Sequence, residues 1–176
     1  RFKCDWSSDV CSSDLDGPAL AQKYAYTYHT SLWKVLTIWT DLKEDFNPEV
    51  GFTQRTGTRF LRHRTDMFIH PSSTSIVREY NPHVLISYFW DENNKLVTKE
   101  NHFAWQVFFR NGSSLEVHFD PQFDRLDDPF DIRKRPLRPT VTIPTGKHNY
   151  YFYSLELGSD PSRVLSGNFS LEKGRY

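Results

Sequence analysis

Two stretches of the chain combine acidic residues with phenylalanine and proline, and their residue types could bind a ligand. The first is DFNPEVGF, Asp45 to Phe52, and the second is FDRLDDPFDI, Phe123 to Ile132. Several carboxylates together could hold Ca²⁺, which prefers oxygen ligands, and two of them could instead form the acid pair of a glycosidase. With the arginines that follow the first stretch, the candidate ligand-binding residues are Asp45, Glu49, Arg55, Arg59, Asp124, Asp127, Asp128 and Asp131.

A structural role for the same residues is the competing interpretation. Acids in loops mostly bond to the turn backbone, and basic residues lie close by in the sequence to pair with them. The spacing of the acids does not match an EF-hand. The seven histidines are scattered without the HExxH spacing, and no GxSxG or P-loop pattern occurs. The sequence therefore predicts no catalytic residue, no metal site and no cofactor.

The segments around these stretches alternate with a period of two, which is typical of β-strands. Tyr24, Tyr26 and Tyr28, for example, alternate with Ala25 and Thr27. Strands are predicted at residues 24–29, 33–41, 59–69, 76–90, 96–110, 115–120, 150–157 and 165–172. Because no amphipathic helix is recognisable, the predicted fold is all-β, an antiparallel up-and-down meander of about eight strands.

The predicted connections differ in length. Asn111–Gly112 is the strongest hairpin signal, because a type I′ turn needs a positive φ at both central positions. Asn81–Pro82 predicts a bulge or bend. A turn is predicted at Asp91 to Asn94 after this fourth strand, in a connection of intermediate length. The sixth strand is followed by a long loop from about Pro121 to Gly146. Alternate connections of a meander lie on one side, so the stretches 45–52 and 123–132 are predicted to share an end and to pack there.

Apolar residues of neighbouring strands are predicted to share one face of the sheet. In a transmembrane barrel this face would point outward to lipid, and in a soluble sandwich it would form the core. Short turns at one end and long loops at the other are typical of outer-membrane barrels. The residues assigned to this face are Phe103, Trp105, Val107, Phe109, Leu115, Val117, Phe119, Tyr151, Tyr153, Leu155 and Leu157.

Composition narrows the class of protein. The chain has 22 basic and 22 acidic residues, so its net charge is zero and no nucleic-acid partner is predicted. Aromatic residues make up 16% of the chain, although the mean hydropathy is −0.64. No apolar run approaches the roughly 20 residues of a membrane helix. Many aromatics in a polar chain without helices leave two classes, a soluble β-sandwich and a transmembrane β-barrel.

The N-terminal residues have a different character. The run CDWSSDVCSSDL, Cys4 to Leu15, resembles the frame translation of a sequencing-library adapter, and it has neither an apolar period nor a signal-peptide core. Residues 1–15 are therefore expected to be a non-native, poorly packed tail, and residues 16–176 a partial β-barrel domain. A genuine disordered N-terminus with a Cys4–Cys11 disulfide is the alternative. The rest of the chain has no cysteine, which excludes a thiol metal site there.

Three runs carry a resemblance to a known family. DFNPEVGF, followed by Gln54, Arg55 and Arg59, resembles the signature of a bacterial family, domain-of-unknown-function family 5916. FDRLDDPFDI at 123–132 and VTIPTGKHNYYFYSLELGSDPSRVLSG at 141–167 are similar to a later part of that family. The resemblance covers about residues 24–176. Members of the family carry a module that looks like a family-9 carbohydrate-binding domain, followed by a region that looks like an outer-membrane barrel.

This resemblance implies a fold, a location and partners. The chain is expected to be an internal fragment of a bacterial outer-membrane β-barrel in contact with lipid, with glycan binding or uptake as its function and with no catalytic residue to carry over. The alternative is a soluble β-sandwich module attached to a carbohydrate-active hydrolase. Detergent dependence separates the two, because only a barrel needs detergent to leave the membrane.

Overall fold

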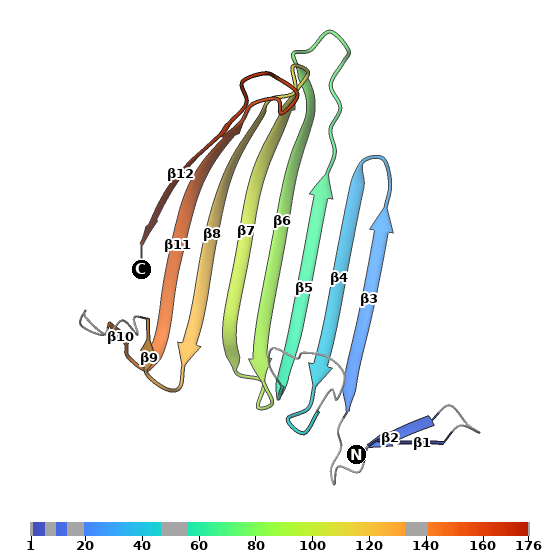
Figure 1. Cartoon of the computed structure of the whole chain (residues 1–176), viewed down its shortest axis with the longest axis vertical. Coiled ribbons are helices and arrows are strands. Elements are labelled where there is room, and N and C mark those ends of the chain that lie inside the picture. Colours follow the sequence, from blue (N-terminus) through green and yellow to red (C-terminus); the bar gives the residue numbers. More distant parts are fainter. Residues whose placement is uncertain (1, 6–9, 14–19, 47–55, 133–140, 176) are drawn as a thin grey trace.

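The computed structural model describes residues 2–5, 10–13, 20–46, 56–132 and 141–175, and most of them form one large sheet (Figure 1). All its strand pairs are antiparallel, and neighbours in sequence are neighbours in the sheet, in the order β12-β11-β8-β7-β6-β5-β4-β3. The predicted eight-stranded up-and-down meander is confirmed; the sheet is open, with β3 and β12 at its edges. The strands are β3 (Ala21–His29), β4 (Trp33–Leu42), β5 (Thr58–Met67), β6 (Val77–Asp91), β7 (Leu96–Phe109), β8 (Ser114–Leu126), β11 (Gly146–Gly158) and β12 (Asn168–Arg175).

Two small hairpins lie outside the large sheet. β1 (Phe2–Asp5) pairs with β2 (Val10–Ser13), and β9 (Phe130–Asp131) pairs with β10 (Thr142–Ile143). Neither hairpin was predicted, because strands of two to four residues are too short to display a period. Within the described residues β1 and β2 pair only with each other, and Cys4 stands opposite Cys11 in their register.

The hairpin at Asn111–Gly112 is confirmed, but its predicted turn type is wrong. Gly112 has a φ of 85°, whereas Asn111 is not among the described residues with positive φ. The Gly112 N–H donates to the Phe109 carbonyl, and the Phe109 N–H donates to Ser113. This pattern is a type I turn followed by one left-handed residue, so only one position, filled by Gly112, needs a positive φ.

The turn between β6 and β7 repeats this design. Asn94 takes the left-handed position with a φ of 60°, its N–H donates to the Asp91 carbonyl, and the Asp91 N–H donates to Lys95. Asparagine tolerates this conformation better than other non-glycine residues. The turn predicted at Asp91 to Asn94 is therefore confirmed, and the connection, residues 92–95, is short rather than of intermediate length.

Pro82 does not bulge its strand as predicted. It pairs with Trp105 in an unbroken stretch of the β6–β7 ladder, and the register shifts lie at Val77/Glu79 and Phe89/Trp90 instead. The Tyr80 backbone bonds to Ile69 on the β5 side, so the Pro82 nitrogen, two residues further on, points to that side too. Since the β5–β6 ladder ends at the pair of residues 66 and 83, the missing N–H of Pro82 leaves no gap in it.

β8 extends further than the sequence indicated. It continues through Pro121 to Leu126, and Asp124 pairs with both Thr98 and His148 across the two neighbouring strands. The second long loop therefore begins after Leu126 rather than at Pro121. Pro121 and the acids after it masked the strand, because both residue types are depleted in strand interiors.

The connections divide between the two ends of the sheet as predicted. Residues 43–57, 92–95 and 127–145 link strands at one end, drawn at the bottom of Figure 1, and residues 30–32, 68–76, 110–113 and 159–167 link them at the other. The two longest connections share the first end, here called the long-loop end. The other is called the short-turn end.

The register gives the sheet two chemically different faces. Phe103 pairs with Phe119, which pairs with Tyr153, and residues directly opposite each other on antiparallel strands share a face. The predicted sharing of one face is confirmed, and the alternation extends it across the whole sheet. This apolar face consists of Tyr24, Tyr26, Tyr28, Trp33, Val35, Trp39, Leu61, Met67, Tyr80, Val84, Ile86, Tyr88, Trp90, Phe103, Trp105, Val107, Phe109, Leu115, Val117, Phe119, Tyr151, Tyr153, Leu155, Leu157, Phe169 and Leu171.

The opposite side, here called the polar face, carries most of the charged side chains of the strands. Its members are the residues that alternate with the apolar set, and Phe60 and Phe89 stack among them with ring centroids 4.3 Å apart. The main polar members are Arg62, Arg64, Asp66, Glu79, Asn81, His83, Ser87, Thr98, Glu100, His102, Gln106, Glu116, His118, Asp120, Gln122, Asp124, Tyr150, Ser154 and Glu156.

Candidate functional site on the polar face

Three histidines from three adjacent strands, His83, His102 and His118, meet on the polar face. The register places Ala104 of β7 between His83 of β6 and His118 of β8, and His102 lies two residues from Ala104 on the same side. The alternation of strand side chains therefore brings all three imidazoles together. The ring centroids of His83 and His102 are 5.2 Å apart, and those of His102 and His118 are 4.8 Å apart.

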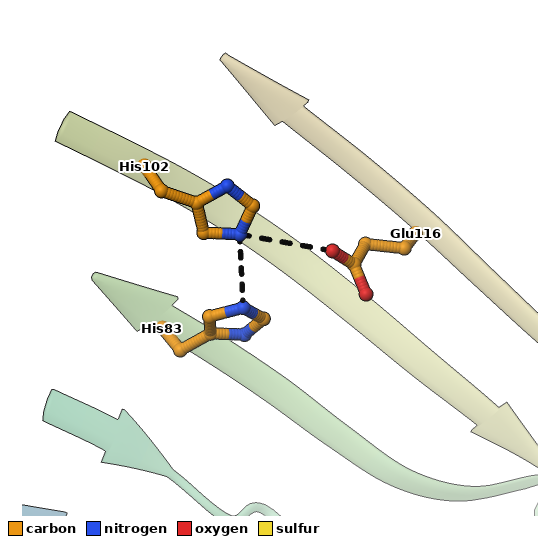
Figure 2. A group of neighbouring side chains, drawn as sticks. All are labelled: His83, His102 and Glu116. Atoms are coloured by element: carbon orange, nitrogen blue, oxygen red, sulfur yellow. Dashed lines mark hydrogen bonds and ion pairs between the residues drawn. The ribbon is translucent and has the colours of Figure 1, made fainter. Parts of the chain in front are cut away.

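The closest contact in this cluster joins two ring nitrogens. Nε2 of His83 lies 3.2 Å from Nε2 of His102, and the same His102 nitrogen lies 3.8 Å from Oε1 of Glu116. His83 is buried, with 7% of its surface exposed, and His102 and Glu116 are partly buried. Figure 2 shows the facing nitrogen of His102 close to both the His83 imidazole and the Glu116 carboxylate.

Asp120 connects two of the histidines through their other nitrogens. Its Oδ1 lies 2.8 Å from Nδ1 of His102, and its Oδ2 lies 2.9 Å from Nδ1 of His118. An ionised carboxylate only accepts hydrogen bonds, so each Nδ1 must carry the proton. Nε2 of His118 then faces Glu156, whose Oε1 is 3.7 Å away.

A salt bridge on β5 borders the cluster. Arg64 donates to both carboxylate oxygens of Asp66 at 2.7–3.1 Å, and Asp66 is buried with 4% exposed. These bonds raise the pKa of the Arg64 guanidinium above its ordinary value against the opposing effect of burial, and the nearby Glu116 carboxylate adds to the rise. Bidentate geometry is the strong form of such a pair and holds Arg64 in one orientation.

A recess of about 730 Å³ opens beside the histidine cluster, between it and the long-loop end. His102 and Asp120 form part of its wall, and the stacked pair Phe60 and Phe89 forms another part. The recess therefore combines aromatic rings with hydrogen-bonding groups. Its polar lining consists of Thr40, Thr58, Arg62, Arg64, Ser87, Thr98, Glu100, Asn101, His102, Asp120 and Gln122.

The acidic candidates of the second stretch are dispersed rather than gathered. Asp124, on the polar face, accepts hydrogen bonds from Thr98 and from the Tyr150 hydroxyl at 2.8 and 2.6 Å. Asp127 pairs with Arg125, Asp131 accepts a hydrogen bond from Thr142, and Asp128 is exposed. Among the described residues, no group of side chains suited to a metal ion includes any of these acids.

The first stretch is only partly within the described residues. Asp45 is exposed in the turn after β4, and Glu49 and Arg55 lie outside the described residues. Arg59 is on β5, where its Nε donates to Asp41 at 3.3 Å and its terminal nitrogen donates to Asn94. The acid paired with Arg59 is therefore a strand residue, not a member of the predicted loop set.

The tight β6–β7 turn and Asp91 beside it contact the first long connection and the end of β8. Glu92 accepts a hydrogen bond from the Glu44 backbone at 3.1 Å, and Asp91 pairs with Arg125 at 2.7 Å. The Arg125 side chain and the Lys95 backbone N–H lower the pKa of the Asp91 carboxyl below its ordinary value. The two stretches share one end of the sheet, but the contacts described there run through this turn rather than directly between them.

The histidine cluster is the site that sequence reasoning missed. The histidines are far apart in the chain, so no short motif contains two of them. The signal was in the register: a hairpin centred near residue 111 places residues 102 and 118 at almost equal distances from its turn and on one face.

Comparisons of the chain with protein-family models, with curated proteins and with solved structures find no match. The resemblance to a family noted from the sequence therefore stays a prediction. Among the described residues no helix is long and apolar enough to cross a membrane. The proposed function therefore rests on the geometry of the two faces.

Proposed function

We propose that this sheet is part of a β-barrel of the bacterial outer membrane, with its apolar face toward lipid and its polar face lining the interior. The observation that carries the proposal is the inverted exposure of the two faces. Trp105, Val117 and Tyr153 on the apolar face are 51–54% exposed, whereas Asp66 and His83 on the polar face are 4% and 7% exposed. Outer-membrane barrels alternate apolar-out and polar-in in this way.

The distribution of aromatic residues supports the same orientation. Near the long-loop end, Trp90 contacts Trp39 and Tyr88 with ring centroids 5.9 and 5.8 Å apart. Near the short-turn end, Tyr80 and Trp105 contact each other at 6.3 Å. Aromatic residues at both margins of an apolar band are the interfacial girdles of a transmembrane barrel.

The apolar face also has a groove suited to hydrocarbon. Its volume is about 630 Å³, and its lining includes Trp33, Met67 and Phe103. The lining is mostly apolar, so an acyl chain could lie against these side chains with little desolvation of polar groups. In the alternative, a soluble β-sandwich, a second sheet would cover this groove.

The recess on the polar face is suited to binding a polar solute, and we propose that this solute is a glycan. Sugar rings stack on aromatic faces such as those of Phe60 and Phe89, and their hydroxyls need the donors and acceptors that Arg62, Glu100 and Gln122 supply. In a closed barrel this recess would open to the lumen. The proposal assigns the chain binding or passage of the solute and no catalytic step.

Refolding tests the membrane assignment. The full chain, unfolded in urea, is diluted into buffer, into buffer with a mild detergent, and into phospholipid vesicles, and sheet content is followed by far-UV circular dichroism. A barrel segment is expected to gain sheet structure and to float with the vesicles, and to aggregate in buffer alone. Stable sheet structure in buffer, with no protein in the vesicle fraction, contradicts the proposal and favours the sandwich.

A further inference from the structure

We propose that His83, His102 and Glu116 bind a divalent transition-metal ion of the Zn²⁺ class on the polar face. The three ligand atoms, two imidazole nitrogens and one carboxylate oxygen, lie within 4.8 Å of one another. Imidazole and carboxylate are common Zn²⁺ ligands, and three protein ligands leave a fourth position for water or a solute group. The site depends on the geometry of the strands, whatever surrounds the sheet.

The spacing of the nitrogens fits one shared ion. Zn²⁺ sits roughly 2.0–2.1 Å from each histidine nitrogen, so two nitrogens at a tetrahedral centre are about 3.3 Å apart. The Nε2 atoms of His83 and His102 are 3.2 Å apart. Oε1 of Glu116 lies 3.8 Å from the His102 nitrogen and within 4.8 Å of the His83 nitrogen, so the Glu116 side chain must move toward both nitrogens to complete the set.

The hydrogen bonds made by Nδ1 of His83 and of His102 leave the two facing Nε2 atoms unprotonated. Nδ1 of His83 lies 3.2 Å from the Asn81 carbonyl oxygen, and Nδ1 of His102 lies 2.8 Å from Asp120; neither acceptor can donate. Both Nδ1 atoms therefore carry the proton, so in neutral imidazoles each Nε2 has a lone pair directed at the other. Two lone pairs at this distance, with a carboxylate beside them, repel unless a cation lies between them.

Asp120 acts as an outer partner rather than as a ligand in this arrangement. Both its oxygens already accept hydrogen bonds, one from His102 and one from His118. A carboxylate that accepts the second N–H of a metal-bound histidine fixes its tautomer and makes it a better ligand. The remaining nitrogen of His118 faces Glu156 and is free of the three-ligand set.

A single proton is the competing occupant. If His83 or His102 became an imidazolium, its Nε2–H would donate to the other ring and the repulsion would vanish. Arg64 does not replace the metal ion or the proton, because its guanidinium is hydrogen-bonded to both carboxylate oxygens of Asp66. Among the described residues, no lysine or arginine forms an ion pair with Glu116.

Co²⁺ binding distinguishes the metal from the proton. The full chain, folded in detergent and freed of metal by a chelator, is titrated with Co²⁺, and its ligand-field absorption in the visible region reports coordination directly. We expect one Co²⁺ per chain, displaced by Zn²⁺. His102→Phe is expected to weaken binding by at least about 100-fold and Asp120→Asn by about 10- to 100-fold. His148→Phe, a histidine on the same face but outside the cluster, is the matched control and keeps full affinity.

Each result decides the question. Equal Co²⁺ affinity in His102→Phe and in the unmodified chain overturns the assignment, as does an unmodified chain with intact sheet structure and no ligand-field band, which leaves the proton as occupant. Circular dichroism checks the fold of every variant, and Glu116→Gln, which keeps the side-chain shape, replaces His102→Phe if that variant does not fold. Failure here leaves the refolding result in vesicles untouched, so the two proposals fail separately.

Discussion

The two faces of the sheet are made by the same strands but differ in which side chains are exposed. On the apolar face, large side chains such as Trp105 and Tyr153 stand about half exposed. On the polar face, Asp66 and His83 are buried, and each of these two has a partner on its own or an adjacent strand. Water favours the reverse arrangement, and the proposed membrane setting accounts for it by placing the apolar side against lipid.

Few apolar residues are buried, because nothing in the described structure covers the apolar face of the sheet. Among the described residues, the buried apolar side chains are Val77, Ala104 and Val107. A single sheet has no second layer to cover its apolar side, so ladder hydrogen bonds and the networks of the polar face must supply much of its order.

Replacing an apolar-face residue near the middle of β7 has the largest expected effect. Phe103→Arg places a charge opposite Val84 and Phe119, and in a bilayer it is expected to cost about 2–4 kcal/mol near the midplane. Gln106→Arg, on the same strand but the other face, is the control and is expected to cost less than about 1 kcal/mol. Urea unfolding in vesicles measures both, and equal losses would remove the distinction between the faces.

The next effect concerns the polar face itself. Arg64→Met leaves the Asp66 carboxylate buried without its cation, and we expect a loss of about 1–3 kcal/mol, less than for a fully buried pair because the Arg64 side chain is 40% exposed. Arg62→Met removes an exposed arginine of the same strand and face, and should change stability by less than about 0.5 kcal/mol. If the two variants unfold at the same urea concentration, the network does not stabilise the sheet.

A smaller loss of stability is expected at the long-loop end, where the contribution of Asp91 depends on pH. The pKa of Asp91 is lowered by Arg125 and by the Lys95 backbone N–H, so this interaction stabilises the fold above the unfolded carboxyl pKa of about 3.9 and is lost as pH falls through the folded value. Asp91→Asn should therefore be less stable than the unmodified chain at pH 7 and equally stable near pH 2. Urea unfolding over this pH range checks the sign; a difference that persists unchanged at low pH contradicts it.

Deletion of the N-terminal residues is expected to leave the stability of the sheet unchanged. β1 and β2 pair only with each other among the described residues, so deleting residues 1–15 should leave the unfolding midpoint of the sheet unchanged. The full chain and the shortened chain are compared by urea unfolding in detergent. A clear loss of stability would place the N-terminal hairpin within the fold.

Much of the sheet could be predicted because period two is a strong signal where one side of a strand is apolar. The tyrosines of β3 and the aromatics of β7 identified their strands, and the β7 aromatics were correctly placed on one face with apolar residues of β8 and β11. The sequence failed where local residue types oppose the strand, as at Pro121 in β8, and where a turn has two designs, as at Asn111–Gly112.

The site was harder to predict than the fold, for a physical reason. His83, His102 and Glu116 come from three strands, so their proximity depends on two strand registers at once, and a slip of one residue in either would move a ligand to the other face. The acidic stretches attracted attention because their residues are adjacent in sequence. Adjacent residues on a strand point to opposite faces, so such runs seldom converge.

Quenching of tryptophan fluorescence by brominated lipids tests the central claim most directly. In the chain without residues 1–15, every tryptophan, namely Trp33, Trp39, Trp90 and Trp105, lies on the apolar face. Bromine quenches only on contact, so vesicles brominated along the acyl chain should quench most of the emission, and aqueous iodide should quench little of it. Emission that is insensitive to brominated lipid and quenched by iodide would contradict a lipid-facing apolar side.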